Sequence, residues 1–272
     1  IYFRTPSAGY DSGSGHTQLS TLDLNLLMPV PLNDRTALLT GLNGLITYLE
    51  PAPQSEQVGL YTYALPAGVS FDYGNGWTSS HMLLPRITSA FDQERRAFQF
   101  GTAQLIQRKL SPTRSWGFGL YFNTEEQGPL VVPLFSYFYR SPGGKLELNA
   151  LLPSRADLNI RFHPKLSGGL AFDGLGNSFA MDLAPYGRSY VQRSSNDLSL
   201  YLQYPLASSL LFSVRGGYSF FRSFRIYDAG DTVHFSFMNI FFDDPRTPLN
   251  DSIRDGTFFS FRLVYRFYLM DL

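Results

Sequence analysis

The chain has 272 residues, of which 44% are hydrophobic and 16% aromatic, while only 16% are charged, with 22 basic and 22 acidic residues. Soluble domains carry roughly 25% charged residues, so this composition favours a protein with a lipid-facing surface. The zero net charge argues against nucleic acid as a partner, because phosphate binding requires a basic footprint. The absence of cysteine excludes disulfides, thiolate metal sites and cysteine nucleophiles.

Apolar runs are short throughout the chain, because Pro, Gly or a charge interrupts each of them. None approaches the roughly 18 residues that a membrane helix needs, which excludes a helical membrane protein. A β-barrel is compatible, since half of each strand faces the lumen and dilutes the hydropathy. Nothing marks a linker, so we expect a single domain over residues 1–272. No signal peptide is visible at Ile1, so an exported protein would be present here in a mature or trimmed form.

Segments in which apolar and polar residues alternate follow one another along nearly the whole chain, separated by Pro, Gly, Asn, Asp and Ser. Each predicts a strand with one apolar and one polar face, because successive side chains of a strand point to opposite faces. In chain order we expect strands at about 1–10, 21–28, 36–49, 61–73, from 77, 97–109, 116–123, 130–140, 145–152, 156–163, 166–177, 189–204, 209–227 and 257–269. This gives about fourteen strands, or twelve if short neighbours fuse.

The last segment, TFFSFRLVYRFYL at Thr257–Leu269, shows the alternation most clearly. Large apolar side chains occupy one face, and Ser260, Arg262 and Arg266 occupy the other. A soluble β-sandwich would also alternate, but its apolar face is usually aliphatic. An aromatic-edged exterior around a polar lumen is typical of an outer-membrane barrel, whose strand count is even in bacterial single chains. We therefore predict an all-β, transmembrane, antiparallel up-and-down barrel, with a soluble sandwich as the fallback.

The connections between strands alternate in length. We expect short turns around Asn33, Gly74, Ser111, Gly143, Pro164 and Ala207. Longer polar connections are expected at 51–57, 91–96, 124–128 and 183–187. Barrels of this class place short turns in the periplasm and longer loops outside. We predict that 228–255 is a large extracellular excursion; the alternative is that its inner part, 232–241, spans the membrane.

Polar residues opposite the apolar faces are predicted to point into the lumen. These residues are Asp23, Asn25, Glu147, Asn149, Asp157, Asn159, Arg161, Arg215, Arg262 and Arg266, and His163 shares their parity. Their mixed signs indicate pairing, with Glu147 and Asp157 as candidate partners for Arg262 and Arg266. Ion pairs fill a narrow barrel, whereas a wider pore keeps such charges as a selectivity lining. Fourteen strands lie between these cases, and we expect a largely occluded lumen.

Three runs carry a resemblance to a known family: LELNALLPSRADLNIRF at 146–162, LSGGLAF at 166–172 and RGGY at 215–218. Together they resemble a family of Bacteroidota outer-membrane barrels that is catalogued as a domain of unknown function. The likeness extends from about Leu19 onward. It implies a barrel and a location in the cell envelope, and it implies no activity, because none is assigned to that family.

Two serine–histidine pairs are candidates for lipid hydrolysis. A Ser nucleophile needs a base within reach and a polar residue that orients the base. His234 and Ser236 are two residues apart, with Asn239 or Asn250 as the third member, and Ser79 and His81 offer the same spacing. Such spacing arises easily by chance in a Ser-rich barrel, so a rim or loop histidine is the simpler interpretation.

Metal binding has little support in the sequence. The four histidines lie far apart in the chain, without the paired spacing of zinc ligands: His16, His81, His163 and His234. Calcium could bind an acidic loop formed by Asp243, Asp244, Asp251 and Asp255, although a solvated acidic loop is the better explanation of these residues. We therefore predict no cofactor and no metal.

These patterns predict a non-enzymatic barrel of the bacterial outer membrane that serves as a structural or accessory subunit of a larger envelope complex. Its expected partners are outer-membrane lipid and lipopolysaccharide, with other outer-membrane proteins as further candidates. One alternative is a passive channel for small or lipophilic solutes. A second alternative is a lipid-modifying enzyme that uses His234 and Ser236.

Overall fold

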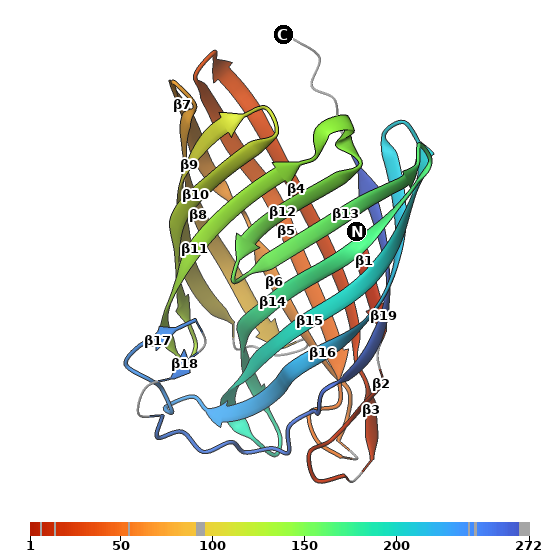
Figure 1. Cartoon of the computed structure of the whole chain (residues 1–272). Helices are drawn as coiled ribbons and strands as arrows, with labels where there is room; N and C mark the ends of the chain where they lie inside the picture. Colours follow the sequence, from red (N-terminus) through yellow and green to blue (C-terminus); the bar gives the residue numbers. More distant parts are fainter. Residues whose placement is uncertain are drawn as a thin grey trace.

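A computed structural model describes residues 1–5, 7–13, 15–53, 55–90, 96–238, 240–241 and 244–266. Fourteen antiparallel strands close into a barrel, which confirms the predicted fold (Figure 1). The wall consists of β1 (Tyr2–Thr5), β4 (Ser20–Asn33), β5 (Thr36–Leu49), β6 (Val58–Ala64) continued by β7 (Ala67–Gly74), β8 (Trp77–Ala90), β9 (Ala97–Ser111), β10 (Arg114–Glu125), β11 (Gly128–Arg140), β12 (Leu146–Leu152), β13 (Arg155–His163), β14 (Leu166–Leu183), β15 (Gly187–Ala207), β16 (Leu210–Asp228) and β19 (Gly256–Tyr265).

The barrel closes through its first strand, because β1 pairs with β4 on one side and with β19 on the other. The strand expected at 61–73 is present but interrupted at Leu65–Pro66, where proline cannot donate to the sheet. The last strand is described only to Tyr265, so the remainder of the expected 257–269 segment lies outside the described residues. No helix in the described part of the chain is long and apolar enough to cross a bilayer.

The outer face of the barrel is apolar, as the alternation predicts. On β4 and β19 the outward side chains are exposed and hydrophobic: Leu22, Leu24, Leu26, Met28, Phe259, Phe261 and Leu263. Exposed apolar surface of this extent marks an interaction or membrane surface in a folded protein. Trp77 and Trp116 lie edge to face on neighbouring outward positions, with ring centroids 6.0 Å apart, near the end of the barrel that carries the short turns.

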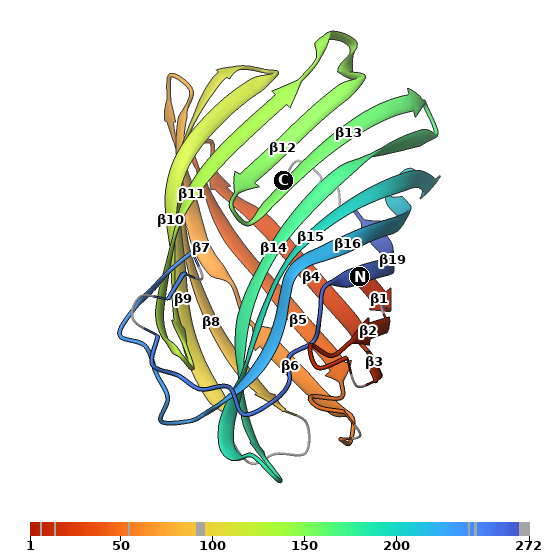
Figure 2. The ribbon, with the colours of Figure 1, turned by 60° about the horizontal axis from the view of Figure 1, so that its bottom comes forward.

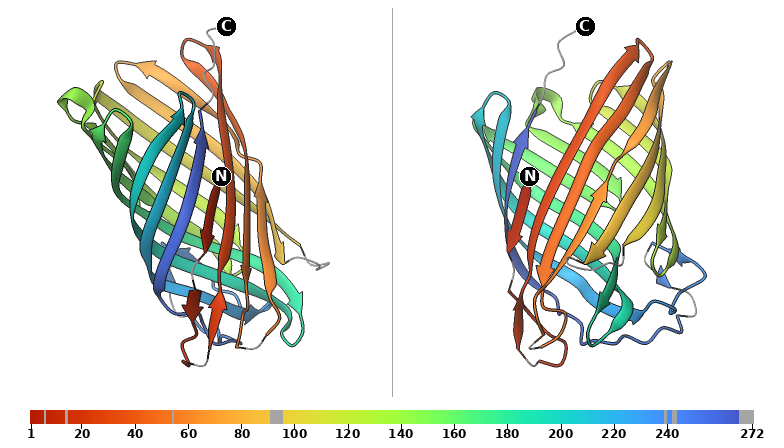
Figure 3. Two further views of the ribbon diagram at one scale, coloured as in Figure 1. Left: turned by 90° about the vertical axis from the view of Figure 1, so that its right-hand side faces the viewer. Right: turned by 180° about the vertical axis from the view of Figure 1, so that it is seen from behind.

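The two ends of the barrel differ in their connections (Figure 3). One end, called the turn end below, carries the expected short turns between β4 and β5, β7 and β8, β9 and β10, β11 and β12, β13 and β14, and β15 and β16. The other, called the loop end, carries the hairpin of β2 (Ser7–Gly9) and β3 (His16–Gln18) and the long connection 229–255. The expected loops at 124–128 and 183–187 are instead tight turns, because β10, β14 and β15 extend further than the alternation indicated.

Within the described residues the connection 229–255 contains no strand of the barrel wall, so the predicted excursion is a loop and the alternative of a spanning strand at 232–241 is wrong, while its extracellular location stays a prediction. Its only strands among the described residues are β17 (Ser236–Phe237) and β18 (Ile240–Phe241). β17 pairs in parallel with the start of β11, at Leu130 and Val131. The loop therefore follows the barrel rim and covers part of one strand edge.

The barrel wall is interrupted below the β12–β13 hairpin. β12 and β13 have 7 and 9 residues, whereas β11 has 13 and β14 has 18 (Figure 2). Within the described residues, the lower half of β14 therefore has no neighbouring strand on this side, and the lower half of β11 pairs here only with β17, at Leu130 and Val131. Here β14 turns inward. Both of its faces are fully buried, with Ser178 and Ala180 on one side and Phe179 and Met181 on the other, each 0% exposed. A wall strand would keep one face towards lipid, so this part of β14 crosses the barrel interior.

An apolar core fills the loop end behind β14. Its buried members are Ala8, Tyr10, Leu19, Leu49, Val58, Leu60, Ala90, Phe179, Met181, Val191, Phe224, Ile226 and Ile253. They come from the loop-end halves of β5, β6, β8, β14, β15 and β16 and from the segments outside the wall. This core, called the apolar seal below, fills the barrel interior at the loop end.

Candidate functional site

A cavity of about 1030 Å³ occupies the turn-end half of the barrel. It reaches the turns at Pro164 and Ser208, and it extends inward as far as Arg193 and Asp197. The structure places all ten residues that were predicted to face the lumen along this cavity: Asp23, Asn25, Glu147, Asn149, Asp157, Asn159, Arg161, Arg215, Arg262 and Arg266. His163, which shares their parity, lines it as well.

The pairing of these residues differs from the expectation. Glu147 binds Arg140, with an N–O distance of 2.8 Å. Asp157 accepts a hydrogen bond of 2.8 Å from the Tyr201 hydroxyl, which in turn accepts one from Asn159. Within the described residues neither carboxylate forms an ion pair with Arg262 or Arg266. The reason is local: Arg140 lies directly opposite Glu147 on the neighbouring strand, and the Tyr201 hydroxyl is bonded to Asp157.

The cavity is much more basic than the chain as a whole. Its lining contains ten cations, Arg4, Arg86, Arg140, Arg155, Arg161, Lys165, Arg193, Arg215, Arg262 and Arg266. The same lining contains five carboxylates, Asp23, Glu147, Asp157, Asp173 and Asp197. Because the chain has 22 residues of each sign, positive charge is concentrated in the lumen.

Four of these cations are held in ion pairs. Arg4 pairs with Asp197, Arg140 with Glu147, Arg215 with Asp173, and Arg86 with Glu125, which lies just outside the cavity lining. The cations without an ion pair among the described residues are Arg155, Arg161, Lys165, Arg193, Arg262 and Arg266. Of the lining carboxylates, Asp23 and Asp157 form no ion pair with any described residue. The unpaired charge in the cavity is therefore strongly positive.

The floor of the cavity consists of charged groups that the sequence analysis missed. Arg4, which is 2% exposed, donates to Asp197 and to Ser219, and its guanidinium stacks on the Phe258 ring with the centroid 3.9 Å away. Arg193 is also buried and donates to the Thr47 hydroxyl. A signal was available, since Arg193 and Asp197 share the parity of Tyr201 on β15. Below this floor the apolar seal begins.

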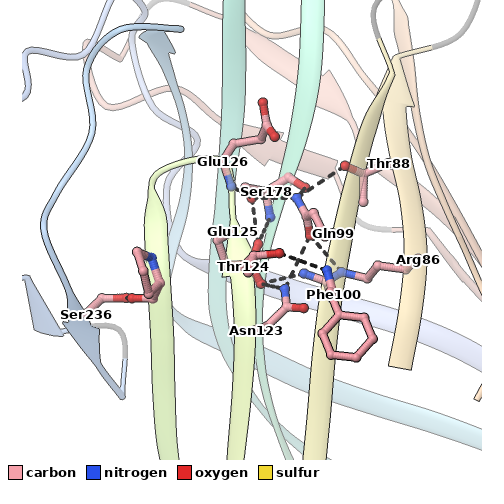
Figure 4. Close-up of polar contacts among 11 residues, drawn as sticks. Arg86, Thr88, Gln99, Phe100, Asn123, Thr124, Glu125, Glu126, Ser178 and Ser236 are labelled. Carbon is pink, nitrogen blue, oxygen red and sulfur yellow. Dashed lines mark hydrogen bonds and ion pairs between the residues drawn. The ribbon is translucent and has the colours of Figure 1, made fainter. Parts of the chain in front are cut away.

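A polar cluster fastens β14 to the inner face of the opposite wall (Figure 4). The Glu125 carboxylate accepts hydrogen bonds from the backbone N–H of Ser178 at 2.9 Å and from the Asn123 amide at 2.8 Å. The same carboxylate accepts further hydrogen bonds from the Ser178 hydroxyl and from the Arg86 guanidinium. In return the Ser178 hydroxyl accepts from the backbone N–H of Glu126 at 2.8 Å. Glu125 thus takes the place of the missing strand at the free edge of β14, and we call this group the Glu125 clasp.

The preferred hydrolase candidate does not form a catalytic group. Ser236 is buried and donates to the carbonyl oxygen of Pro129 at 3.2 Å, away from His234. The Asn250 amide donates to the carbonyl oxygens of Pro51 and Phe224. Asn239, the other proposed third member, lies outside the described residues.

The second pair does come together, on the outward face of the barrel. The Ser79 hydroxyl lies 3.0 Å from His81 Nε2, and His81 Nδ1 contacts the side-chain oxygen of Gln104. However, Ser79 is only 2% exposed, and the Tyr73 hydroxyl lies 2.8 Å from its oxygen. A nucleophile must reach its substrate, so this covered hydroxyl is best explained as part of a self-satisfied polar network on an apolar face.

The acidic loop offers no arrangement for calcium in its described part. Asp244 binds Arg246, Asp251 accepts from the backbone N–H of Ser12, and Asp255 accepts from that of Arg222. Asp243 lies outside the described residues. A search of the described residues finds no group of three or more His, Cys, Asp or Glu side chains placed to hold a metal ion.

A protein family described as "Domain of unknown function (DUF6268)" matches residues 78–261. The chain belongs to this family. The predicted resemblance to a family of unknown function is thereby confirmed, while the Bacteroidota origin stays a prediction. A comparison with proteins of curated function finds no significant match.

Two solved structures are similar to this chain. One is titled "TodX monoaromatic hydrocarbon channel deltaS2 mutant", with 10% identity, a TM-score of 0.45, and coverage of 98% of this chain and 88% of that one. The other, "CymD monoaromatic hydrocarbon channel", has 10% identity, a TM-score of 0.37 and the same coverage of 98% and 88%. These likenesses are too distant to bear on what this chain binds.

Proposed function

We propose that the protein is a non-enzymatic barrel of the bacterial outer membrane that does not conduct along its axis and acts as an accessory subunit of an envelope assembly. The apolar seal carries this proposal. Burying one large apolar side chain is worth about 1.5 kcal/mol or more, so exposing only four members of the seal would cost about 6 kcal/mol. The open form would then be populated at roughly one molecule in 10⁴.

The outer surface supports the membrane location. Its exposed aliphatic and aromatic band suits outer-membrane lipid and lipopolysaccharide as the surrounding medium, and the tryptophans at the turn end suit a lipid–water interface. The short turns support a periplasmic placement of the turn end, so the lumen opens towards the periplasm and the apolar seal faces outward. A blind barrel of this kind contributes to an assembly through its loops or exterior.

Planar-bilayer recording tests the sealed lumen. We expect the purified full chain to insert without producing single-channel steps, with insertion verified by protection of the barrel from added protease. Stable conductance steps from wild-type protein would overturn the proposal. Purification from native membranes in mild detergent tests the accessory role, because a barrel recovered alone would contradict it.

The non-enzymatic character is tested on the Ser79 network, which has the better geometry of the two candidate pairs. We expect no release of fatty acid from phospholipid vesicles by the wild-type protein, and no labelling of Ser79 by a fluorophosphonate probe. Hydrolysis that disappears in Ser79→Ala, with Ser80→Ala as the matched control, would contradict the proposal. The same assay on Ser236→Ala addresses the other pair.

The interrupted wall favours a second candidate function, a lateral passage for lipophilic solutes. The cavity lining reaches Leu175 and Asn177 on the part of β14 that lacks a neighbouring strand. A solute could then leave the lumen sideways into the bilayer without crossing the apolar seal. Uptake of the dye N-phenyl-1-naphthylamine by cells producing the protein tests this candidate. Asn177→Trp should slow uptake, Leu170→Trp on the lipid face should not, and equal uptake in all three strains removes the candidate.

A further inference from the structure

The lumen contains a surplus of cations that the protein itself does not neutralise. Six lining cations lack an ion pair among the described residues, against two lining carboxylates. Charges in a barrel interior must be hydrated or paired. An excess of one sign in this cavity therefore concentrates mobile anions inside it.

Arg193 shows that this surplus reaches the floor. Its side chain lines the cavity and is 4% exposed, yet its one hydrogen bond among the described residues goes to a neutral hydroxyl, Thr47 Oγ1, at 3.2 Å. Its Nε has no hydrogen-bond partner in the part of the chain that the structure describes. Arg4 lies close enough to repel it, and Asp197 is already committed to Arg4 and Ser219. A buried guanidinium without a bonded counter-charge is costly, and an anion in the cavity would supply that counter-charge.

A second group of guanidiniums lies between the floor and the mouth. Arg155 and Arg215 both act electrostatically on Arg262, together with the carboxylates Asp157 and Asp173. Arg215 is paired with Asp173 at 3.4 Å, which leaves Arg155 and Arg262 for a ligand. Closer to the turns, Arg161, Lys165 and Arg266 line the mouth. Cations thus occur at successive depths, so an entering anion meets positive charge along its whole path.

We propose that the lumen is a binding site for a small multivalent oxyanion, a molecule bearing two or more phosphate or carboxylate groups, that enters from the turn end. Guanidinium groups bind both kinds of oxyanion through paired N–H donors, which lysine cannot do. The cavity of about 1030 Å³ matches the upper range of small-molecule sites, so the ligand is a compact molecule and not a folded partner. Several charges are needed because the guanidiniums lie at different depths.

The apolar seal determines whether anions in the lumen are bound there or pass through the barrel. In an open porin the same cations would form a selectivity lining through which anions pass. Here the floor leads into a dry core, so an anion that enters must leave by the mouth, and the cations make a binding site. This inference goes beyond the proposed accessory role, since it assigns the lumen a ligand.

Isothermal titration with inorganic tripolyphosphate tests the site, using the full chain in an uncharged detergent at low ionic strength. We expect saturable binding with one anion per barrel, and no binding of the polycation spermidine. The double variant Arg155→Gln with Arg262→Gln should weaken binding at least tenfold. Arg108→Gln is the control for the loss of an exposed arginine charge, because Arg108 is also exposed but stacks on Trp77 on the outer face.

The outcomes separate this proposal from the sealed-barrel function. Absence of saturable tripolyphosphate binding, or an equal loss in the lumen variant and in Arg108→Gln, overturns the binding site while leaving the sealed barrel untouched. Conductance steps in a barrel that still binds tripolyphosphate would overturn the seal and retain the site. A circular dichroism spectrum with unchanged β content verifies that the double variant remains folded.

Discussion

The two halves of the barrel use the same strands for opposite purposes. Along the inward face of β14, the turn-end positions Asp173 and Asn177 line a polar cavity, whereas the next two inward positions, Phe179 and Met181, belong to a dry core. The alternation of faces is unbroken between them, and only the chemistry of the inward residues changes. The difference teaches that strand count does not decide whether a barrel is a pore; the side chains on the inward parity decide it.

The halves also follow different rules of stability. Above the buried floor of the cavity, the turn-end half behaves like a porin interior, where partly exposed charges such as Arg140 and Glu147 each contribute little to stability. The loop-end half behaves like a soluble protein, where apolar burial dominates and each buried polar group needs a partner. The Glu125 clasp lies at the border, since it satisfies the free edge of β14 where that strand leaves the wall. Substitutions in the loop-end half should therefore lower the free energy of unfolding far more than similar substitutions in the turn-end half.

Removing the clasp carboxylate should have the largest effect. Glu125→Ala leaves the Arg86 guanidinium, whose side chain is 11% exposed, without its counter-charge, and it leaves the Ser178 N–H without an acceptor. Breaking a buried pair from one side costs about 3–5 kcal/mol. The free energy of unfolding, measured by urea titration in lipid vesicles, should fall by that amount.

The control for the clasp is the ion pair in the other half. Arg140 and Glu147 are joined at 2.8 Å, but their side chains are 49% and 39% exposed, so Glu147→Ala should cost less than about 1 kcal/mol. Similar losses in the two variants would show that the halves are not energetically distinct.

Truncating a member of the apolar seal should come next. Phe179→Ala removes a side chain that is 0% exposed and should cost about 3 kcal/mol, the lower end of the usual range, because the adjoining cavity lets water relieve part of the void. Phe118→Ala removes the same atoms from the outer face, where the ring is 59% exposed on the protein, and should cost less because lipid fills the vacated space and no cavity remains. Equal costs in the same urea titration would contradict the existence of a dry core at the loop end.

Much of this contrast could be predicted from the sequence, and the missing part has a physical reason. The strands and their outward faces follow from local alternation, because each strand reports its own two faces; Leu22 to Met28 are an example. The seal does not follow, because Phe179 and Met181 continue the same alternation, and only their contacts with distant strands such as β6 and β8 distinguish a core from a lipid face. The expected strand accordingly ended at Asn177.

Because local alternation does not report contacts between distant strands, the candidate site could be predicted only in part. The lumen-facing residues could be named because parity is local, whereas their partners could not, because pairing across a barrel depends on register and side-chain reach. Glu147 therefore pairs with Arg140, and Asp157 accepts a hydrogen bond from Tyr201, whereas the sequence suggested Arg262 and Arg266 as the partners of these carboxylates. The clasp was missed for a further reason: Glu125 fell in a segment expected to be a loop, where a carboxylate carries no structural signal.

A change of lumen charge should have a smaller effect, confined to the turn-end half. Asp157→Asn keeps an oxygen that can accept from the Tyr201 hydroxyl and removes one of the two unpaired carboxylates. Tripolyphosphate should then bind about 2- to 5-fold more tightly, since one repulsive charge is lost in a partly hydrated cavity. Asp11→Asn makes the same charge change on the exposed hairpin at the loop end and should leave the titration unchanged. Equal tightening in both variants would attribute the effect to net charge alone.

The smallest effect concerns pH and the loop that covers the loop end. Asp244 binds Arg246 through two hydrogen bonds of 2.7 and 2.8 Å, and Arg246 is held between the rings of Tyr227 and Phe241. The hydrogen bonds from Arg246 lower the pKa of Asp244 below its ordinary value of 3.8. Because the folded pKa is the lower one, the stabilisation is fully present above the unfolded pKa and is lost as the pH falls through the folded pKa.

Hydrogen exchange across residues 229–255 should therefore be unchanged between pH 7 and pH 5, after correction for the intrinsic exchange rate, and should accelerate only below about pH 4. Asp244→Asn should show the faster exchange already at pH 7, because the ionised acceptor is gone at every pH. Acceleration between pH 7 and pH 5 would instead implicate a group with a higher pKa, and would show that this carboxylate does not hold the loop against the barrel. The barrel strands serve as the internal control, since their exchange should stay slow throughout while the loop opens.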